Sequence, residues 1–446
     1  MNAIPSSAVP RRDDDLDEGL APPDAASTSP PDTRAAAVAP DLASTRPLRI
    51  QMIAPTPFFA DRGCHVRILE EVRILEKLGH QVQVVTYHHG RDLPGIDIVR
   101  SVTVPWYRKL APGPSVHKLY TDWLLVGAAL HAAEHFRPHL VHGHLHEGIF
   151  VGEFLRRRYR IPLVADLQGS LADEVADHTS DRVKHLGGRM FERAERWLTS
   201  LPDCIVTSSS RFAEIVREQF GRDDVVTLAD AVDTERFRPL PRSGELASAM
   251  GIPDDRQIVV FLGVLTGYQG VEHLLEAARK ILKHRRKLQF LIMGYPSVES
   301  YRERAADLGI ADHITFPGRI DYDRACEYLN LGDIAVSAKL SRTEANGKLF
   351  NYMACGLPVV AYDSPINREI LADLGCYAEY GDTDSLAFQI DALLDDHQRR
   401  RDLAAHLRAR VVEHFSWNRA GLELANLYDA LLARRREQKA ASQVSG

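Results

Sequence analysis

Short apolar runs alternate with segments of helical periodicity over most of the chain, and this alternation constrains the fold more than any other feature. Apolar runs of this length, bounded by polar loops, are typical of strands buried on both faces. Strands that alternate with helices predict a parallel sheet covered by helices. The first strands are expected at Leu48–Ala54, Val82–Thr86, Leu140–His142, Pro162–Asp166 and Cys204–Ser208. Helices are expected between them around Val66–Leu78, Trp123–His135 and Gly187–Ser200.

A second series of the same kind follows. Between the two series lies Arg238–Ser243, whose prolines and charges are typical of a linker. The fold class is therefore α/β, with two Rossmann-like domains. In such folds ligands bind at the carboxyl ends of the strands, so both sets of strand ends are expected to face one central cleft. The strands of the second series are expected at Ile258–Gly263, Gln289–Gly294, His313–Pro317, Asp333–Ser337 and Leu357–Tyr362.

These patterns divide the chain into five parts. Residues 1–46 are rich in Ala, Pro, Ser and Asp and are expected to be a disordered tail. The first Rossmann-like domain is expected at residues 47–237 and the second at 238–416. An amphipathic helix is expected at 417–434, packed across the domain junction, and a flexible tail at 435–446.

The segment Ala338–Asp363 carries the clearest chemical signal. A buried strand, Ile334–Ser337, runs into a polar loop with a glycine, and a short helix follows. Backbone N–H groups at a helix start attract anions, and Lys348 adds a full positive charge there. Glu344 and Asn351 flank the same loop with groups that bind hydroxyls. Phosphate on one side and sugar hydroxyls on the other predict a nucleotide-sugar site.

Several ordered landmarks together resemble the retaining glycosyltransferases of family 4, which have the GT-B fold. The resemblance extends from Leu48 to Leu432, and it depends on the order and spacing of the landmarks rather than on any single one. They are the loop Pro55–Gly63, the helix end Leu78–His80, Val141–His144, Thr207–Ser210, Val232–Pro239, Phe261–Gly270, the donor loop Glu344–Asn351 and Phe415–Trp417.

The resemblance implies that the first domain binds the acceptor and the second the nucleotide sugar, and it implies which residues form the donor site. The family usually has an Arg and a Lys where this chain has Val264 and Gln269. Lys348, with Lys339, is therefore expected to supply the missing charge, and Lys348 and Glu344 are the expected catalytic residues. The other expected donor-binding residues are Arg62, Gly63, Thr266, Gln269, Gly270, Asn346, Gly347, Leu349 and Asn351, and the nucleobase is expected to meet backbone atoms around Gly318–Ile320.

The segment His142–Glu147, HGHLHE, superficially resembles a metal site. Its spacing argues against zinc, because His142 and His144 leave a strand and no distant acid–histidine pair is evident in the sequence. We expect no metal there, and instead place several polar side chains on the acceptor side of the cleft. Many relatives have a histidine near the reacting sugar where this chain has Gln168. The expected acceptor-side residues are His144, His146, Glu147, Asp166 and Gln168.

The function implied by the resemblance is transfer of a hexosyl group from a UDP- or GDP-sugar to a hydroxyl of a glycan or lipid-linked acceptor, as in the synthesis of cell-surface polysaccharide or glycolipid. Retention through a front-face displacement is implied, with no cofactor beyond the nucleotide-sugar co-substrate and no metal. Two alternatives stay open: a nucleotide-sugar 2-epimerase, and a catalytically degenerate nucleotide-sugar-binding protein. The second is motivated by Val264 and Gln269.

Charge and cysteine content limit the partners and the setting. The net charge of −6 includes −4 in residues 1–46, so no overall basic field favours nucleic acid. Local basic clusters, including Arg156–Arg158 with Arg160 and Arg434–Arg436, are typical of solvated helix faces, with membrane docking as the alternative. Five irregularly spaced cysteines predict a reduced cytoplasmic setting. The aromatic and basic segment Pro105–Pro114 leaves a peripheral contact with the inner membrane open.

Overall fold

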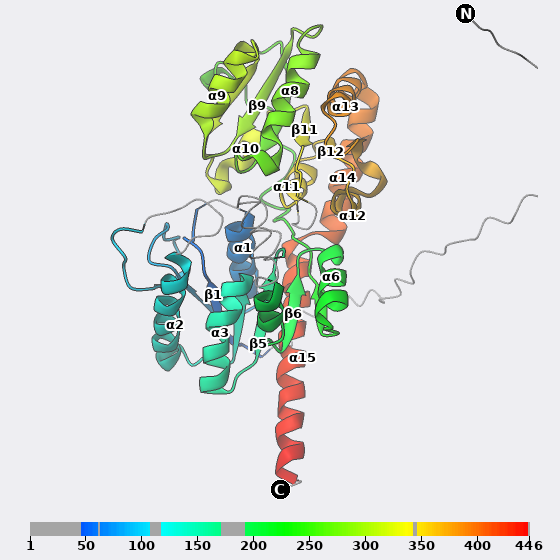
Figure 1. The fold of residues 1–446 in the computed structure, drawn as a ribbon. Helices are drawn as coiled ribbons and strands as arrows, with labels where there is room; N and C mark the ends of the chain where they lie inside the picture. The colour runs from blue at the N-terminus through cyan, green and yellow to red at the C-terminus, as the bar shows by residue number, and fades with distance from the viewer. Residues whose placement is uncertain (1–45, 61–62, 108–116, 171–191, 342–345, 445–446) are drawn as a thin grey trace, which may run out of the picture. The chain divides into compact units, whose positions relative to one another are not determined.

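The computed structural model describes residues 46–60, 63–107, 117–170, 192–341 and 346–444. Contacts group residues 44–446 into one compact unit. Of the tail predicted at residues 1–46, only Arg46 is among the described residues, and most of the segment Pro105–Pro114 also falls outside them. Figure 1 shows the described elements with their labels.

The first half of the chain forms a parallel sheet in the strand order β3-β2-β1-β4-β5-β6-β7. Every neighbouring pair in it is parallel. The order reverses between β1 and β4, which creates a crevice at the carboxyl ends of these two strands. The strands are β1 (Arg49–Ala54), β2 (Gln81–Thr86), β3 (Asp97–Arg100), β4 (Leu140–His144), β5 (Leu163–Leu167), β6 (Cys204–Thr207) and β7 (Val225–Thr227).

The second half repeats this plan with the order β10-β9-β8-β11-β12-β13, again parallel throughout. Its order reverses between β8 and β11. The α/β class with two Rossmann-like sheets is therefore confirmed. The strands are β8 (Gln257–Leu262), β9 (Leu288–Met293), β10 (Ile314–Gly318), β11 (Ile334–Ser337), β12 (Val359–Tyr362) and β13 (Cys376–Ala378).

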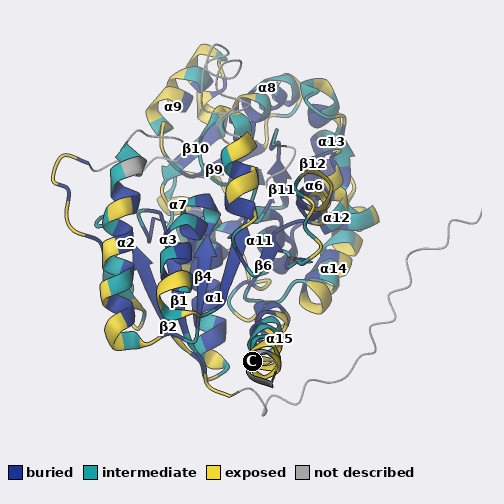
Figure 2. Cartoon of the chain, turned by 60° about the horizontal axis from the view of Figure 1, so that its bottom comes forward, coloured by how far each residue is buried: buried dark blue, intermediate teal, exposed yellow. Residues whose placement is uncertain are grey.

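Helices connect the strands and cover the faces of both sheets (Figure 2). Residues 192–199 are also helical. In the first half the helices are α1 (Gly63–Lys77), α2 (His117–Phe136), α3 (Leu145–Tyr159) and α6 (Ser210–Phe220). In the second half they are α7 (Gly244–Ala249), α8 (Val271–Ile281), α9 (Val298–Asp307), α10 (Ala325–Leu329), α11 (Lys348–Ala354), α12 (Pro365–Leu371), α13 (Thr383–Asp395), α14 (His397–His414) and α15 (Trp417–Val444).

The central strands are buried on both faces, as their continuous apolar sequences require. Alternate residues of β1 contribute to different cores, because successive side chains of a strand point to opposite faces. Ile50 and Met52 pack on the face covered by α1, whereas Ile53 packs on the other face, against α2 and α3. Figure 2 shows these strands as buried, with exposed residues on the outer sides of the helices and in the loops.

In the first half, strands β3 and β7 and helices α3 and α6 were absent from the sequence prediction, and strand β13 was absent in the second half. Strands β3, β7 and β13 have three or four residues each, so no apolar run is long enough to mark them. All three lie near or at the edge of a sheet. Helix α3 begins at Leu145, directly after β4. Its GIFVGEF core is apolar enough to read as strand or helix.

Helix α15 runs back from the second sheet along the first one. Ser416, just before it, bridges to Val232, and Tyr428 reaches His142 of β4 with a 2.5 Å hydrogen bond. The helix lies close to α1, since a Cβ on Gly421 would come within 2.3 Å of the Ile74 side chain. Figure 1 shows α15 beside α1 and continuing past the end of the first sheet. Among the described helices, none combines the length and apolar content that crossing a bilayer requires.

Candidate active site

A cavity of about 240 Å³ lies where the carboxyl ends of the two sheets meet. Its walls come from the start of α1 and from the loops that follow β5, β6, β7, β8, β9, β10 and β11. Both topological switch points, β1/β4 and β8/β11, therefore contribute to one site, as expected for this fold. The residues on which the chemistry below depends are Arg67, Asp230, Gly263, Gln269, Lys339, Asn346, Gly347, Lys348 and Asn351.

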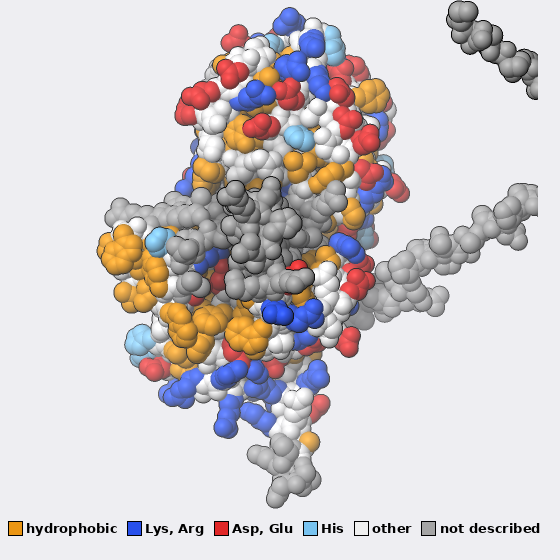
Figure 3. All heavy atoms as spheres, viewed as in Figure 1, with side chains coloured by type: hydrophobic (Ala, Val, Ile, Leu, Met, Phe, Trp, Pro, Cys, Tyr) orange, Lys and Arg blue, Asp and Glu red, His pale blue; other side chains and the backbone are white. Residues whose placement is uncertain are grey.

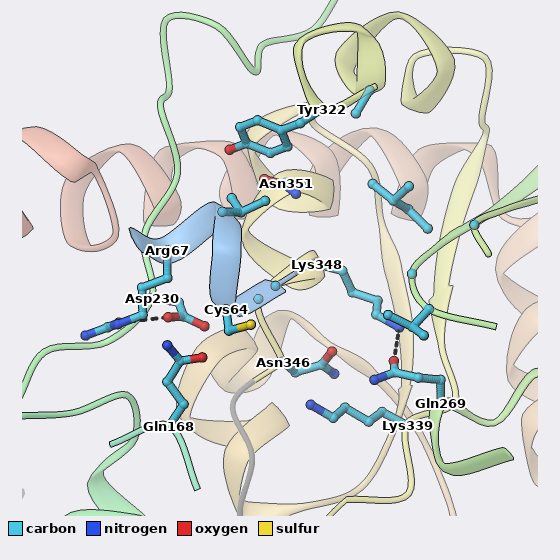
Figure 4. Close-up of a pocket in the computed structure, with 18 of the residues that line it drawn as sticks. Cys64, Arg67, Gln168, Asp230, Gln269, Tyr322, Lys339, Asn346, Lys348 and Asn351 are labelled. Carbon is cyan, nitrogen blue, oxygen red and sulfur yellow. Dashed lines mark hydrogen bonds and ion pairs between the residues drawn. The ribbon is translucent and has the colours of Figure 1, made fainter. Parts of the chain in front are cut away.

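Two lysines and a glutamine lie together on the second-sheet side of the cavity (Figure 4). Lys348 begins α11, and its Nζ donates a 2.6 Å hydrogen bond to Oε1 of Gln269. Lys339 follows β11 and is only 5% exposed. Gln269 stands at the position where the resemblance implies a lysine. The amine of Lys348 therefore lies beside the place where the family's usual lysine would be.

The path of the Lys348 side chain depends on a glycine and an aromatic ring. A Cβ on Gly263 would lie 2.9 Å from Nζ of Lys348, so the absence of a side chain there leaves room for the amine. Nζ also lies 4.3 Å from the centre of the Phe261 ring, a cation–π distance. The lysine is thus held over the end of β8 rather than extended into solvent.

Three more predicted donor residues line the cavity from the donor loop. Asn346 is 2% exposed, and its Nδ2 donates to Ser337 Oγ and to Asn367 Oδ1, at 2.9 and 2.8 Å. These bonds fix the loop to β11 and to α12. Gly347 faces Asp230 across the cavity, where a Cβ would come within 3.2 Å of Oδ2. Asn351, one turn into α11, also lines the cavity.

Gly270, Leu349 and Thr266, which were also predicted to bind the donor, lie outside the lining of the cavity. The N–H of Gly270 donates to Gly267 O at 2.9 Å, so it is not directed at a ligand, and Gly270 does not line the cavity. Its φ of +74° and its close approach to Ala338 O explain the glycine instead. Leu349 is fully buried in the core. Thr266 precedes a short 3-10 turn and lies outside the lining.

Two predicted residues, Arg62 and Glu344, lie outside the described residues. Gly63 is described, and it begins α1 at the edge of the cavity, with open space around the position of a Cβ. The predicted nucleobase region is represented by Arg319 and Ile320, which both line the cavity. Gln168 also lines it, from the loop after β5.

The sequence analysis missed a buried arginine on the first-sheet side of the cavity. Arg67, in the first turns of α1, is 2% exposed. Its Nε lies 2.7 Å from Asp166 and 3.1 Å from Glu71, and its Nη1 lies 2.8 Å from Asp230. Figure 4 shows the pairing with Asp230 at the cavity wall. Arg67 and Glu71 are four residues apart on a helix that follows a glycine loop. This i,i+4 pair was the local sequence signal that could have predicted the buried arginine.

Burial and charge act in opposite directions in this cluster. Burial opposes the charge of Arg67, but the three carboxylates outweigh it and raise its pKa. Burial also opposes the charge of Asp166, yet Arg67 and His144 lower its pKa well below the usual range. Glu71 differs, because burial dominates and raises its pKa well above the usual value. Asp166 is therefore the ionised partner of Arg67, and Glu71 is the carboxyl most readily protonated.

Four predicted acceptor-side residues, His144, His146, Glu147 and Asp166, lie outside the lining of this cavity, so their acceptor-side role stays a prediction. His144 is fully buried, and its Nδ1 lies 3.1 Å from Oδ2 of Asp166, which is itself held by Arg67. His146 pairs with Glu195 at 3.3 Å. Glu147 accepts a 2.6 Å hydrogen bond from Lys118.

Contrary to the expectation from the sequence, acids from distant segments do accompany these histidines. Glu71 and Asp166 lie beside His142 and His144, and one ligand atom from each of the four lies within 4.8 Å of the others. Several of these atoms have no hydrogen-bond partner among the described residues, including both oxygens of Glu71. The guanidinium of Arg67 lies against both carboxylates, so the cluster contains a cation of its own.

A pH-dependent stability is expected from Asp122 of α2, which lies near Lys118 and Glu147. Burial, followed by the charge of Glu147, raises the pKa of Asp122 to about 7. A carboxyl whose pKa is raised on folding favours the folded state at low pH, and this stabilisation is lost as pH rises from about 4 to about 7. The stabilisation of the folded state that is lost between these two pH values is roughly 4 kcal/mol at most.

Asp122→Asn should therefore raise the melting temperature by a few degrees at about pH 8, and the gain should vanish near pH 4. The amide oxygen can still accept the 2.6 Å hydrogen bond from Tyr87. Thermal unfolding followed by circular dichroism at both pH values measures this. An equal difference between the two proteins at both pH values would contradict the assignment.

Polar contacts join the two walls of the cavity at its rim. Arg91 pairs with Asp321 at 3.1 Å, and Ser210 Oγ donates to Glu369 at 2.8 Å. These side chains are exposed, and exposed pairs contribute at most about 1 kcal/mol each. Opening of the cavity to admit a large ligand therefore costs little at these points.

Comparison with known families agrees with this geometry. The family model "Glycosyl transferase 4-like domain" matches residues 62–229, and "Glycosyl transferases group 1" matches residues 244–410. The first match covers most of the first sheet, and the second covers the second sheet with its donor loop. The chain belongs to the family 4 type of glycosyltransferase. A D-inositol 3-phosphate glycosyltransferase of Geodermatophilus obscurus is 29% identical over 85% of this glycosyltransferase and 87% of the relative.

Solved structures share the GT-B fold of this glycosyltransferase. The sucrose-phosphate synthase of Thermosynechococcus elongatus has a TM-score of 0.74 at 20% identity, covering 87% of this chain and all (100%) of the other. HepE of Anabaena, solved in complex with UDP and glucose, has a TM-score of 0.69 at 16% identity, covering 86% and 100%. At these identities the likeness establishes the fold.

Proposed function

We propose that this glycosyltransferase takes a hexosyl group from a UDP- or GDP-sugar and transfers it to a hydroxyl of a glycan or lipid-linked acceptor. The observation that carries the proposal is the pair Lys348 and Lys339, whose side chains line one cavity at the carboxyl ends of two parallel sheets. The amine of Lys348 makes a hydrogen bond to a neutral glutamine. A diphosphate offers the ammonium group an anionic acceptor, which binds it more strongly than the neutral amide oxygen does.

The proposed reaction proceeds with retention of the anomeric configuration. The bond between the anomeric carbon and the diphosphate oxygen breaks while the acceptor oxygen bonds to the same face. The acceptor proton passes to the departing phosphate oxygen. Negative charge grows on the diphosphate as the bond breaks, so fixed cations at Lys348 and Lys339 stabilise the transition state more than the ground state. These two residues carry out the neutralisation that Mg²⁺ performs in other transferases.

Arg67 is proposed to act on the other wall. Its buried charge fixes Asp230 at the cavity surface, where burial raises the pKa of Asp230 despite the opposing charge of Arg67. A carboxylate at this position can accept hydrogen bonds from acceptor hydroxyls. This supports a hydroxyl-bearing acceptor on the first-sheet side. A relative that is a D-inositol 3-phosphate glycosyltransferase, and the HepE complex with UDP and glucose, are compatible with an acceptor and a donor of this kind.

The test is nucleotide release from UDP- and GDP-sugars, measured with and without an extract of glycans and lipids as acceptor. We expect one nucleotide to be released, several-fold faster with the extract, and transfer of label from the sugar to a component of the extract. Val264 and Gln269 favour a degenerate nucleotide-sugar-binding protein as the second candidate. Tight binding of a UDP- or GDP-sugar with no release under any condition would establish that candidate instead. Conversion of the sugar without any acceptor would indicate an epimerase.

A further inference from the structure

A second hollow lies at the opposite end of the first sheet from the active site. It has a volume of about 330 Å³ and is formed where the chain enters β1, β4 and β5, together with the later turns of α15. None of its lining residues lines the active-site cavity. We call it the basic pocket, because its charged and titratable lining residues are Arg46, His139, Arg160, Arg435, Arg436 and Lys439.

The lining of the basic pocket contains five cationic side chains and no acid. Within the described part of the chain, no ion pair involves Arg46, Arg160 or Arg436. The nearest acid is Asp203, whose Oδ2 lies 3.9 Å from Nη1 of Arg435, too far for a hydrogen bond. The same Oδ2 accepts a 2.9 Å hydrogen bond from the N–H of Leu163. Among the described residues, Arg46, Arg160 and Arg436 therefore line the pocket with charges that no acid pairs with.

One donor in this pocket is buried and unused. Nη1 of Arg435 has almost no contact with solvent and makes no hydrogen bond within the described structure. A buried guanidinium nitrogen without an acceptor costs free energy that a bound anion would recover. The positive field also reaches His139, where burial and then the charges of Arg49, Arg46 and Arg436 lower the pKa.

Helix ends do not account for the charge. Cations are favourable in the last turn of a helix, where the backbone carbonyls are free. Arg160 is at such a place, at the end of α3. Arg435 and Arg436, however, lie two turns before the end of α15 at Val444. Like charges held around one hollow repel each other, and a multivalent anion removes that repulsion.

We propose that the basic pocket binds a multiply charged phosphate group. Guanidinium groups match phosphate oxygens with paired N–H donors, and the lysine adds a compact charge. The lining also includes Leu48 and Leu432, and apolar surface beside the charged groups lowers the local dielectric constant and strengthens those contacts. Two kinds of ligand carry such a phosphate group: a free oligophosphate, and an anionic lipid with a phosphomonoester headgroup. Figure 3 shows further Lys and Arg side chains gathered at the lower end of the same half of the molecule.

The experiment uses the full chain, with sodium tripolyphosphate as the soluble probe and calorimetry as the readout. Arg435→Gln/Arg436→Gln should weaken binding at least about tenfold, since each replaced charge-assisted bond contributes about that factor. The matched control is Arg434→Gln, because Arg434 is exposed on the same helix and does not line the pocket. The control should bind as tightly as the wild type.

Two further experiments distinguish binding in the basic pocket from binding in the active site, and distinguish the two kinds of phosphate ligand. Tripolyphosphate binding should persist in Lys348→Ala, and the double arginine variant should keep the transfer rate of the wild type. Co-sedimentation with vesicles of phosphatidylcholine and phosphatidic acid, but not of phosphatidylcholine alone, would identify a lipid headgroup if the double variant abolishes it. Tripolyphosphate binding without vesicle binding would identify a free oligophosphate. Binding of neither probe, or equal binding by the double variant, would overturn the proposal.

Discussion

Lys348→Ala is expected to lower kcat/KM for nucleotide-sugar turnover by about 10²–10³, the usual loss when one charge-stabilising donor is removed. The physical reason is the balance of charge in the cavity. Val264 and Gln269 are neutral where the resemblance implies an Arg and a Lys, and the amine of Lys348 lies 2.6 Å from Gln269 Oε1. Lys348 is thus the cation nearest to the place where the diphosphate is expected. The melting temperature should stay unchanged, because the side chain is only partly buried.

Two companion variants make this prediction specific. Lys287→Ala is the matched control, because that lysine is 75% exposed and pairs only at the surface, with Asp255. It should leave turnover unchanged. Adding Gln269→Lys to Lys348→Ala should restore part of the lost rate, because the new amine is placed beside the lost one. Full activity in Lys348→Ala would refute the assignment of Lys348 as the principal cation.

Gly263 offers an independent test of the same geometry. In Gly263→Ala the new Cβ would lie 2.9 Å from Nζ of Lys348, so the flexible end of the lysine must move. Turnover should fall while the fold is kept, since the atom displaced is the end of a long side chain rather than backbone.

Arg67→Met should have the largest effect on stability, lowering the free energy of unfolding by about 3–5 kcal/mol. The variant leaves Asp166 and Glu71 fully buried without their cation. Asp166 has a pKa lowered in the folded state, so its contribution is present above its unfolded pKa and is lost as pH falls. The deficit of Arg67→Met should therefore be largest near neutral pH and should narrow below about pH 4.

Urea denaturation of the wild type and the variant at two pH values measures this. Lys77→Met is the control on the same helix, because Lys77 is exposed and its 3.2 Å hydrogen bond to Asn418 lies at the surface. Its cost should stay below about 1 kcal/mol. Adding Asp166→Asn to Arg67→Met should recover part of the loss, because it removes a buried charge that has no partner. If Arg67→Met costs no more than the control, the network does not stabilise the fold.

The donor side of the site could be predicted from the sequence, because its parts follow one another directly in the chain. A strand, a glycine loop and a helix start follow one another between Ile334 and Ala354, so the spacing alone places Lys348 and Asn351. The structure puts both in the cavity lining. Gly270 misled the sequence argument, because glycine before a helix suggests an anion site, whereas here it relieves a close approach to Ala338 O.

The first-sheet side of the site could not be predicted from the sequence, because it is assembled from segments that lie far apart in the chain. Arg67, His144, Asp166 and Asp230 come from α1, β4, β5 and the loop after β7, and only the folded sheet brings them together. Histidines that leave a strand look like cleft residues in a sequence. In the structure β4 is buried throughout, and the next helix starts at once, so these side chains point into the core.

The central claim is that Lys348 holds the diphosphate of a nucleotide sugar at the carboxyl ends of the two sheets. A crystal structure of this glycosyltransferase with UDP or GDP tests it most directly. We predict diphosphate oxygens about 3 Å from Nζ of Lys348, with the hydrogen bond to Gln269 given up or shared. An ordered nucleotide whose diphosphate lies elsewhere, with the hydrogen bond from Lys348 to Gln269 unchanged, would contradict the account.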